Sequence, residues 1–513
     1  MNQRYTIGID IGGTNTDAVF INQDGILLKS TKTTTTANVT EGFSAALQDV
    51  ITGYPANSIT HIKVGTTHAT NALLQHNNLF TVGIIRIAGH NPQLPPYYNW
   101  PSSLKKTVFR GVSTIDGGFE CSGQSITPFN PDQAIKAAQQ LQTQGAESIA
   151  LVGVFSPLNA SQEELAAEAI KNSLGSSLSI TCSAHVGGIG FIERENAAIL
   201  NSALKKSLIN GFQDLAQAAH SLGLTAARLS FVQNNGTIID MHTACMYPLF
   251  TLSAGPTNSF IGGAKLAGLT EALVIDIGGT STDVGLIKNG FPRRTLNSST
   301  IANIPLNFPA PDVCSTALGG GTCIKIDNET PCLESKSVGN RLLIDSVSFG
   351  GSSLTLTDVA LKAGLITIKN AEPDRVSLTK QQIDSLYAQI KNRLQELIEK
   401  MRGPEQNISI VLVGGGATLL PPNLIPNAIT CPHANVANAY GAALAEISAT
   451  VDTVVSLTQR DIILTELRNQ ALNLAVEQGA AASLVRVIEE KIIPYHYIPN
   501  NLARIIITAA GGQ

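Results

Sequence analysis

Two nearly identical eight-residue segments, 266 positions apart, constrain how this chain of 513 residues can fold. Asp10–Asp17 is DIGGTNTD and Asp276–Asp283 is DIGGTSTD, so seven of the eight positions agree. Each segment follows a short apolar run and precedes another, which is the pattern of a strand, a tight turn and a second strand. The repetition predicts two related halves that place one such turn on each side of a cleft.

The residue types of the two turns suit a phosphate ligand. Adjacent glycines can take positive φ and can let a ligand approach the backbone closely, and the residues after them offer hydroxyl and amide groups to an anion. Asp10 and Asp276 end strands directly before the turns, where a carboxylate can hold Mg²⁺ beside substrate phosphates. The expected phosphate-binding residues are Gly12, Gly13, Thr14, Asn15, Thr16, Gly278, Gly279, Thr280, Ser281 and Thr282.

Two ordinary β-hairpins are the alternative, because Gly-Gly is also a hairpin signal. The recurrence of the octapeptide in matching strand contexts favours the phosphate site. Neither copy fits the P-loop pattern or the GxGxxG pattern of dinucleotide-binding proteins, so those two classes lose support.

Composition limits the class of protein further. Apolar residues make up 43% and charged residues 14% of the chain, as in a globular enzyme with two or three domains. The net charge of −4 implies no nucleic-acid partner. Seven scattered cysteines without a C-x-x-C pair, and no apolar signal core at the N-terminus, predict reduced thiols in a cytoplasmic protein. The sequence contains no run of about 18 apolar residues, so we expect no membrane span.

Alternating strand and helix patterns predict a mixed α/β layer fold. Residues 89–130 are rich in Pro, Gly, Tyr and Ser and are expected to form an irregular loop with a small hairpin. The expected helices span 39–51, 131–144, 163–173, about 193–219, 356–363, 378–401, 435–449 and 459–478. The expected strands beyond the two hairpins include 61–64, 81–87, 148–154, 229–232, 408–413, 483–489 and 503–508.

Three further segments are candidates for the site. Gly65–Asn71 joins a strand to a helix through GTTH, an arrangement that favours anions at a helix N-terminus. Its Thr66, Thr67, His68 and Asn71 are candidate substrate contacts, with His68 a candidate catalytic residue, although a lone histidine is more often structural. Arg194 follows a glycine loop and is a candidate for binding a carboxylate or phosphate. Gly414, Gly415 and Gly416 end a strand and would let a nucleoside lie against bare backbone.

These segments together resemble the hydantoinase A / 5-oxoprolinase / acetone carboxylase β-type family, within the actin–sugar kinase–Hsp70 group of ATPases. The resemblance rests on IGIDIGGTNTD at 7–17, GTTHATNALL at 65–74, ERENAAILN at 193–201 and DIGGTSTDV at 276–284. QNNG at 233–236, LSAGPT at 252–257, the glycine triplets at 319–321 and 414–416, and IPYHYIP at 493–499 also fit. It runs through most of the chain.

The resemblance implies two actin-like (ribonuclease H-like) domains with ATP and Mg²⁺ in the cleft between them. It implies segments 1–180 and 181–450 for these domains, and 451–513 packing back on the core. It implies an ATP-dependent opening of a cyclic amide such as a hydantoin or 5-oxoproline. Asp10 and Asp276 would manage the metal, and the three glycine segments would bind the nucleotide. A small-molecule kinase, a carboxylase component or a non-catalytic nucleotide-gated protein on the same scaffold are the alternatives.

The chain departs from the family pattern in two respects. The family has an Asp-x-His segment before the first glycine triplet, whereas this chain has Asp312 followed by Cys314. Any role in binding a metal or substrate is therefore in doubt there, although a Cys–Asp pair could still take a soft metal. The chain also stops where many relatives continue, as a short form would. Relatives often need a second, hydantoinase B-type subunit, so a partner subunit and an oligomer are expected.

Overall fold

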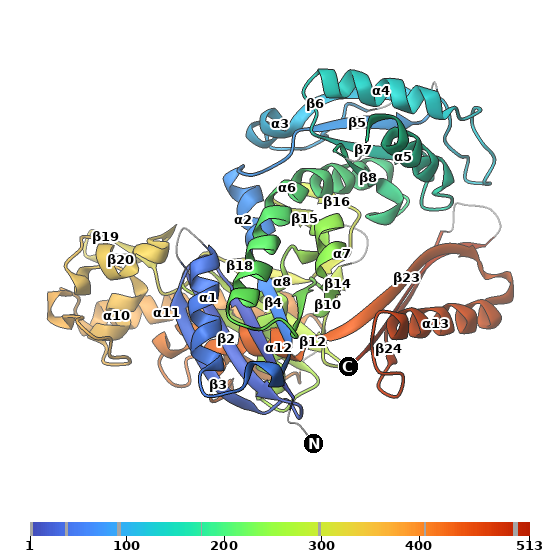
Figure 1. Ribbon diagram of the computed structural model, residues 1–513. Coiled ribbons are helices and arrows are strands. Elements are labelled where there is room, and N and C mark those ends of the chain that lie inside the picture. Colours follow the sequence, from blue (N-terminus) through green and yellow to red (C-terminus); the bar gives the residue numbers. More distant parts are fainter. Residues whose placement is uncertain are drawn as a thin grey trace.

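The fold is described from a computed structural model that places residues 4–35, 39–89, 94–175, 177–295, 299–404, 407–495 and 501–512. Most of the IPYHYIP segment, at 496–499, lies outside these residues, as does Thr36 at the end of the Thr-rich run. Mixed sheets flanked by helices make up the molecule, as the alternating pattern predicts (Figure 1).

The first sheet begins with the predicted hairpin. Strand β1 (Tyr5–Ile11) pairs antiparallel with β2 (Asn15–Asn22), which pairs with β3 (Leu27–Thr34). On its other side β1 pairs in parallel with β4 (Ile59–Thr66), which pairs with β9 (Arg228–Val232). Helix α1 (Val39–Ile51) covers this hairpin, and its Phe43, Leu47 and Val50 are fully buried. Apolar strand residues buried on both faces explain why β1 is an almost unbroken apolar run.

Residues 82–182 form a sheet of their own, of order β6-β5-β7-β8, in which all pairs are parallel (Figure 1). The prediction of an irregular loop with a small hairpin over 89–130 is wrong for residues 102–115, which form a helix and an edge strand. The sequence FRGVSTI alternates too weakly to reveal a strand whose partners lie elsewhere. The elements are β5 (Val82–Ile87), α3 (Ser102–Val108), β6 (Phe109–Ile115), α4 (Pro131–Thr143), β7 (Ser148–Gly153), α5 (Ser161–Leu174) and β8 (Ser179–Cys182).

A long helix, α6 (Phe191–Ser221), leads back from this unit to the first sheet, close to the predicted bounds. It packs against α1 and against α2 (His68–Gln75). After β9 the chain continues through β10 (Thr237–Asp240), the short α7 (Met241–Met246) and helix α8 (Ala254–Leu266) into the second half.

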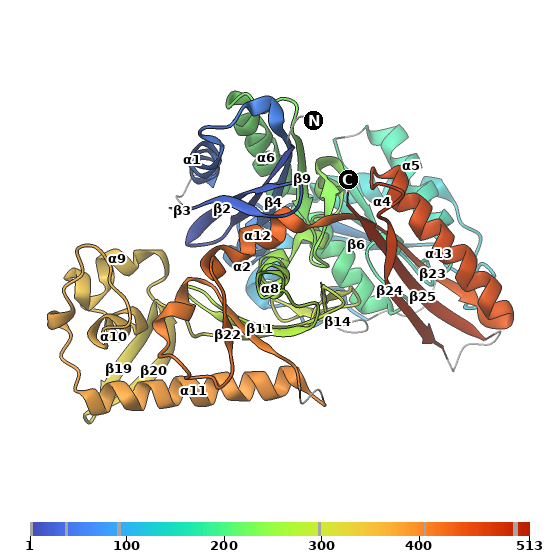
Figure 2. The same ribbon diagram turned by 90° about the horizontal axis from the view of Figure 1, so that it is seen from below.

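The second sheet repeats the first hairpin. Strand β11 (Ala272–Ile277) pairs antiparallel with β12 (Thr282–Lys288) and in parallel with β21 (Ile410–Val413). Helix α11 (Lys380–Arg402) packs beside it, and the Thr379 side chain caps its N-terminus. A separate lobe of this half contains two strands and two helices (Figure 2). They are β19 (Thr322–Asp327), β20 (Thr330–Ser337), α9 (Leu342–Asp345) and α10 (Leu356–Lys362). Short pairs complete the half: β13 (Phe291–Pro292), β14 (Arg294–Thr295), β15 (Ser299–Ile301), β16 (Ile304–Leu306), β17 (Ala310–Pro311), β18 (Val313–Thr316) and β22 (Ile429–Thr430).

Two crossing helices join the halves. Helix α8 packs on β11 and β12, whereas α12 (Ala437–Leu444), which follows the second sheet, packs on β1 and β2 of the first. The helices cross at glycines, because a side chain at Gly262 would collide with the Ala437 carbonyl and one at Gly441 with the Asn258 carbonyl. Bare backbone at the crossing allows the close approach.

The C-terminal segment returns to the first sheet. The prediction of one helix over 435–449 is wrong, because α12 ends at Leu444 and strand β23 (Glu446–Ser456) begins two residues later. The strands expected at 483–489 and 503–508 are present as β24 (Arg486–Pro494) and β25 (Leu502–Gly511), with α13 (Arg460–Glu477) on one face. In α13, Leu464 is buried, whereas Val476 is 39% exposed.

The first sheet therefore has nine strands, in the order β24-β25-β23-β10-β9-β4-β1-β2-β3. It draws on residues 5–66, 228–240 and 446–511, so it crosses both predicted segment boundaries, at 180 and 450. Those boundaries stay a prediction about sequence segments, while the two hairpin-centred sheets are the related halves of an actin-like fold.

Candidate functional site

The two repeated turns have the same backbone design. Asp10 lies opposite Asp17 in the first hairpin, and Asp276 lies opposite Asp283 in the second. Each turn is closed by one backbone hydrogen bond of 2.9 Å, from Gly12 N–H to Asn15 C=O and from Gly278 N–H to Ser281 C=O. Nearly identical sequences have thus produced the same strand pairing and the same turn closure.

The turns face each other. A methyl group added at Gly279 would lie 3.7 Å from the Thr14 hydroxyl oxygen of the opposite turn. In the described part of the chain, the N–H groups of Gly13, Thr14, Gly279 and Thr280 donate no hydrogen bond to protein. Unpaired N–H groups on two opposed turns form a concave donor surface that suits phosphate oxygens.

Asp10 is buried and held by two amides. Asn258 of α8 donates to one oxygen at 3.3 Å, and Asn438 of α12 donates to the other at 3.1 Å and to Asp17 at 2.8 Å. Burial, followed by the charge of Asp17, raises the pKa of Asp10 to about 6, although the amide donors lower it. The crossing helices therefore fix this carboxylate from both halves of the chain.

Asp276 is the counterpart in the second turn. Burial raises the pKa of Asp276 to about 7, and the charges of Asp283 and Asp10 add to the rise, whereas a hydrogen bond from Ser259 opposes it. Asp283 accepts a hydrogen bond from Ser315 at 2.5 Å. Because the charges of Asp10 and Lys32, which belong to the first half, act on Asp276, the two turns share one electrostatic environment.

Among the described residues, Lys32 is the cation that forms an ion pair within this cluster of four carboxylates. The Lys32 ammonium on β3 lies 2.5 Å from Asp17, and its charge lowers the pKa of both Asp10 and Asp276. Negative charge therefore remains in excess, which a divalent cation would neutralise. Two carboxylates with room for water and phosphate are the donor set that Mg²⁺ takes. No cluster of three or more His, Cys, Asp and Glu side chains able to form a protein-only cage occurs in the described ranges.

A cavity of about 670 Å³ opens beside the third glycine segment. Gly414 has a φ of +86°, and a side chain there would collide with Asp276 Oδ1. Gly415 faces open space and lines the cavity, whereas Gly416 packs against Ile277 instead. Lys32 also lines this cavity, which is otherwise largely apolar and includes Leu412, Leu420, Leu424, Ile425, Ala428, His433 and Asn435. Its shape and lining suit a nucleoside whose phosphates reach the turns.

The Gly65–Asn71 segment adjoins the first turn. Thr67 donates from its hydroxyl to the Ile11 carbonyl at 3.0 Å, and Asn71 donates to Thr67 at 3.2 Å. Buried Thr66 lies 2.7 Å from His68 Nδ1, while the other ring nitrogen faces Gly211 of α6. Burial lowers the pKa of His68. Thr67 and Asn71 thus lie beside the first turn, but the His68 ring turns away from the carboxylate cluster.

Several predicted ligand residues are used by the fold itself. Thr16 is buried, with its hydroxyl 3.1 Å from that of Thr35, and Thr282 donates to the Leu318 carbonyl at 2.6 Å. Arg194 is fully buried and donates to the carbonyls of Gly153, Gly188 and Ile189 and to the Ser183 hydroxyl. Its position holds the glycine loop in place and gives no support to the predicted substrate contact.

Asp312 accepts a hydrogen bond from Arg293 at 2.9 Å, and Cys314 lies in β18 opposite Val284. Asp312 is therefore committed to an ion pair that the sequence pattern did not indicate.

Sequence reasoning missed the residues that support the carboxylates. Asp17 and Asp283 were visible as the last residues of the octapeptides. Lys32 stood in a Thr-rich run without any signal of function. Asn258 and Asn438 lie hundreds of positions from Asp10, which they contact, so one sequence alone offers no sign of them. Ser259 lies closer to Asp276 along the chain, but nothing in the sequence marks it as a hydrogen-bond donor to that carboxylate.

Comparison with protein families agrees with this geometry. Residues 6–174 match the hydantoinase/oxoprolinase N-terminal region, and residues 194–371 match the hydantoinase/oxoprolinase domain. The chain belongs to the hydantoinase/oxoprolinase family, as the sequence motifs predict.

Curated relatives are distant and mostly longer. The acetophenone carboxylase gamma subunit of Aromatoleum aromaticum is 23% identical over 86% of this chain and 68% of its own length. The acetone carboxylase beta subunit of Xanthobacter autotrophicus is 24% identical over 76% and 58%. The caprolactamase subunit alpha of Pseudomonas jessenii is 23% identical over 78% and 60%. An uncharacterized protein of Methanocaldococcus jannaschii shares 24% identity over 67% of this chain, which spans only about half (53%) of that protein.

Solved structures confirm the fold. A nucleotide-free acetone carboxylase chain matches 100% of this chain and 88% of its own length, with a TM-score of 0.73 at 16% identity. The ATP-dependent caprolactamase of Pseudomonas jessenii matches 99% and 87%, with a TM-score of 0.77 at 17% identity. Among the described helices, none combines the length and apolar character needed to cross a membrane.

Proposed function

We propose that this chain is an ATP-dependent enzyme that activates the carbonyl group of a small molecule, with a cyclic amide as the favoured acceptor. The observation that carries the proposal is the convergence of Asp10 and Asp276 with two opposed turns whose N–H groups are free. The names of the caprolactamase and acetone carboxylase relatives support ATP use on carbonyl compounds.

The chain's residues have separate roles in this proposal. Free N–H groups of the two turns bind the β- and γ-phosphates of ATP, and the cavity at Gly414 and Gly415 binds the nucleoside. Asp10 and Asp276 hold Mg²⁺, directly or through water, and the ion when bound neutralises charge that develops on the phosphates. Lys32 offers a further positive charge at the boundary between phosphates and nucleoside.

Positioning and charge neutralisation supply most of the catalysis in phosphoryl transfer. The acceptor's carbonyl oxygen attacks the γ-phosphorus, and the bond to ADP breaks. Water then adds to the activated carbon, the ring C–N bond breaks and the nitrogen takes up a proton. The acyl phosphate that remains is hydrolysed by a second water to a carboxylate and phosphate. Closure of the halves about the glycine crossing of α8 and α12 would keep bulk water from the phosphorylated intermediate.

The direct test is ADP release from the purified full chain with Mg·ATP and a panel of hydantoins, lactams and 5-oxoproline. A cyclic amide of the panel is expected to raise ADP release well above the ATP-only rate and to yield the ring-opened amino acid. If no member of the panel does so, the cyclic-amide claim fails while the nucleotide site can still stand on measured ATP binding.

A carboxylase component is the second candidate, favoured by the two carboxylase subunits among the relatives. The phosphate site would be the same, but the phosphorylated species would be a ketone enol or bicarbonate. Phosphorus NMR of the products, with and without bicarbonate and a ketone, separates the two reactions. Tight ATP binding with no turnover under either condition would favour a nucleotide-gated regulatory protein instead.

We infer also that the active form includes a second, hydantoinase B-type subunit or a further copy of this chain, in a cytoplasmic setting. The relatives named as beta, gamma and alpha subunits support this inference. Turnover by the chain alone, unchanged when candidate partners are added, would contradict it.

A further inference from the structure

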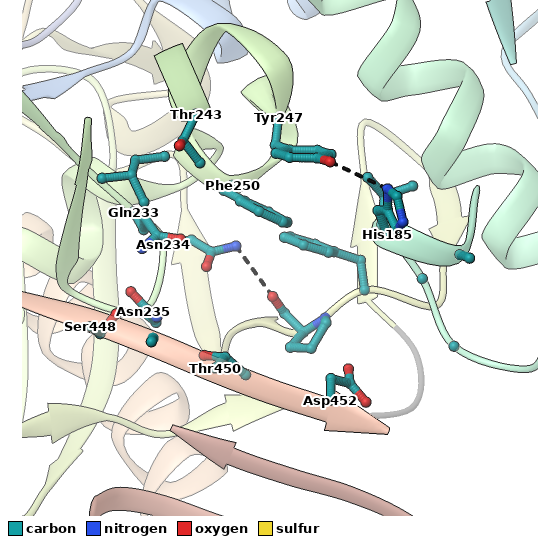
Figure 3. Close-up of a pocket in the computed structure, with 18 of the residues that line it drawn as sticks. His185, Gln233, Asn234, Asn235, Thr243, Tyr247, Phe250, Ser448, Thr450 and Asp452 are labelled. Carbon is teal, nitrogen blue, oxygen red and sulfur yellow. Dashed lines mark hydrogen bonds between the residues drawn. The ribbon is translucent and has the colours of Figure 1, made fainter. Parts of the chain in front are cut away.

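A second cavity, of about 440 Å³, lies apart from the two turns, where three regions meet (Figure 3). The loop at 184–188 borders it on one side, and the end of β9 with α7 borders it on another. Strand β23 of the C-terminal segment forms its floor. Cavities that hold small molecules start at roughly 300 Å³, so this one has room for a single small ring.

One wall of this cavity is aromatic. Figure 3 shows Tyr247 next to Phe250, and their rings stack with centroids 5.3 Å apart at 25°. Phe250 also stacks on Phe308, at 5.6 Å and 8°. Three nearly parallel rings form a continuous apolar face. A flat ligand gains both burial and offset stacking against such a face.

The side chains of Gln233, Asn234 and Asn235 form the opposite wall. Hydrogen bonds to the protein fix the orientation of each of these amides. Asn235 Oδ1 accepts from the Thr237 amide at 3.0 Å and from its hydroxyl at 2.6 Å, and Gln233 Nε2 donates to the same hydroxyl at 3.1 Å. Asn234 Nδ2 donates to the Pro309 carbonyl at 3.2 Å. Asn234 is 3% and Asn235 8% exposed, so both are almost fully enclosed.

These bonds leave one donor and two acceptors for a ligand. Within the described residues, Asn235 Nδ2 has no acceptor, and Gln233 Oε1 and Asn234 Oδ1 have no donor. A cis-amide presents an adjacent C=O and N–H, which require a donor and an acceptor side by side. An enclosed amide wall of this kind discriminates strongly against ligands that leave its groups unpaired.

The charges around the cavity cancel. Arg504 is 4% exposed and gives two hydrogen bonds to Asp452, at 2.8 and 2.6 Å. Arg294 donates to Glu489 at 2.8 Å. Both guanidinium groups therefore already carry a carboxylate, although Arg294 Nε has no hydrogen-bond partner among the described residues. A ligand carboxylate would have to compete with Asp452 or Glu489 for its counter-charge, which disfavours an anionic ligand.

We propose that this cavity binds a neutral cyclic amide or imide, stacked on Tyr247 and Phe250 and hydrogen-bonded through its amide edge to Gln233, Asn234 and Asn235. The class of ligand is the acceptor class of the proposed function, on which the choice of probe rests. Binding itself needs no nucleotide, so it is measured independently of turnover.

The test is a titration of the full chain, without nucleotide, by calorimetry or ligand-observed NMR. 2-Pyrrolidinone and 5-oxoproline form a matched pair, since they differ by one carboxylate, and hydantoin supplies a second neutral ring. The neutral rings are expected to bind, and 5-oxoproline is expected to bind at least about tenfold more weakly. Equal binding of the matched pair, or no binding of either neutral ring, overturns the proposal.

The N235D variant keeps Oδ1 for Thr237 but replaces the free donor with a carboxylate oxygen. It is expected to weaken neutral-ring binding roughly tenfold, while N172D on the exposed face of α5 changes nothing. F250L, which keeps an apolar side chain but removes the stacking ring, is a second test should N235D fold poorly. Unchanged affinity in N235D and F250L assigns the ligand elsewhere and overturns the proposal.

The D276N variant separates this proposal from the proposed function. It removes a carboxylate of the nucleotide site and is expected to leave ring binding intact. Neutral rings that bind in the cavity but never raise ADP release uphold the cavity and contradict the cyclic-amide reaction. Rings that raise ADP release equally in the parent and in N235D uphold the reaction and contradict the cavity.

Discussion

The two turns share seven of eight residues, yet their surroundings differ. At the first turn, Asp10 receives amide donors from both crossing helices, and Lys32 lies against its neighbour Asp17. The pKa of Asp10 rises to about 6.

At the second turn, Asp276 receives a single hydroxyl donor, from Ser259, and among the described residues no lysine or arginine forms an ion pair with Asp276 or Asp283. The pKa of Asp276 rises to about 7. A repeated octapeptide thus sets backbone geometry, whereas side chains contributed from elsewhere set the charge state. The first turn lies beside Lys32, the cation of the cluster, and the second turn adjoins the cavity at Gly414.

The largest expected effect comes from removing either carboxylate. D10N and D276N are each expected to reduce ATP turnover on the order of 1,000-fold, because metal-mediated neutralisation is worth several kcal/mol. Steady-state ADP release measures the loss. D24N, in the exposed turn between β2 and β3, is the control and should keep parent activity. Retained turnover in either cleft variant would show that the two turns do not serve one metal.

Stability should respond in the opposite direction. The pKa of Asp276 in the folded state, about 7, lies above its value in the unfolded chain. Ionisation of Asp276 therefore lowers the stability of the fold progressively as the pH rises from about 4 to about 7. In metal-free protein at pH 8, D276N is therefore expected to be more stable than the parent by roughly 2–4 kcal/mol, and much less so at pH 5.

Urea unfolding at both pH values, with a chelator present, measures this difference. D10N should gain less, because the donors of Asn258 and Asn438 would face a new amide N–H group. A D276N protein less stable than the parent at pH 8 would contradict the conclusion that ionised Asp276 destabilises the metal-free fold.

These contrasts show how far sequence reasoning reached. The octapeptides predicted both hairpins, because the signals lie within a few residues, and the long amphipathic patterns located α6, α11 and α13. The sheet of nine strands was not predictable, because its strands come from three distant parts of the chain. The alanine-rich run from Ala437 hid the change from α12 to β23, since no Gly or Pro marks it.

The site divides in the same way. Asp10, Asp276 and the glycines were predicted as site residues from local chemistry, and that assignment stays a prediction. Arg194, which follows a glycine loop, was predicted to bind a carboxylate or phosphate, yet its side chain is buried and each of its three nitrogens donates to the fold. Asn258 and Asn438 could not be assigned, because their contacts with Asp10 exist only once α8 and α12 have crossed.

Lys32 offers a way to remove the asymmetry between the turns. K32M is expected to lower kcat/KM for ATP roughly tenfold to thirtyfold, as the loss of one charge-assisted contact would. Because Lys32 lowers the pKa of both cleft carboxylates, its removal should also move the acid limb of the pH profile to higher pH.

K29M is the matched control, since Lys29 lies on the same strand and pairs with Asp49 at the surface. An unchanged acid limb in K32M would mean that Lys32 does not govern the charge of the cluster.

The smallest expected effect concerns communication between the cleft and the second cavity. Thr257 of α8 donates to the Asn234 carbonyl at 2.9 Å, and the next residue, Asn258, holds Asp10. Binding of a neutral ring on Asn234 should therefore change the apparent affinity for Mg·ATP, by roughly fivefold, and ATP should change ring affinity by the same factor. The T257V variant loses the hydroxyl but keeps the side-chain shape. Neutral rings and Mg·ATP should each still bind to it, but the factor by which one ligand changes the affinity for the other should fall toward one. T251V, equally buried but bonded only to Pro248, should keep it. If the coupling survives in T257V, it does not pass through the Thr257–Asn234 hydrogen bond of α8. The contact of Asn258 with Asp10 would then not connect the first turn to the amide side chains of the second cavity.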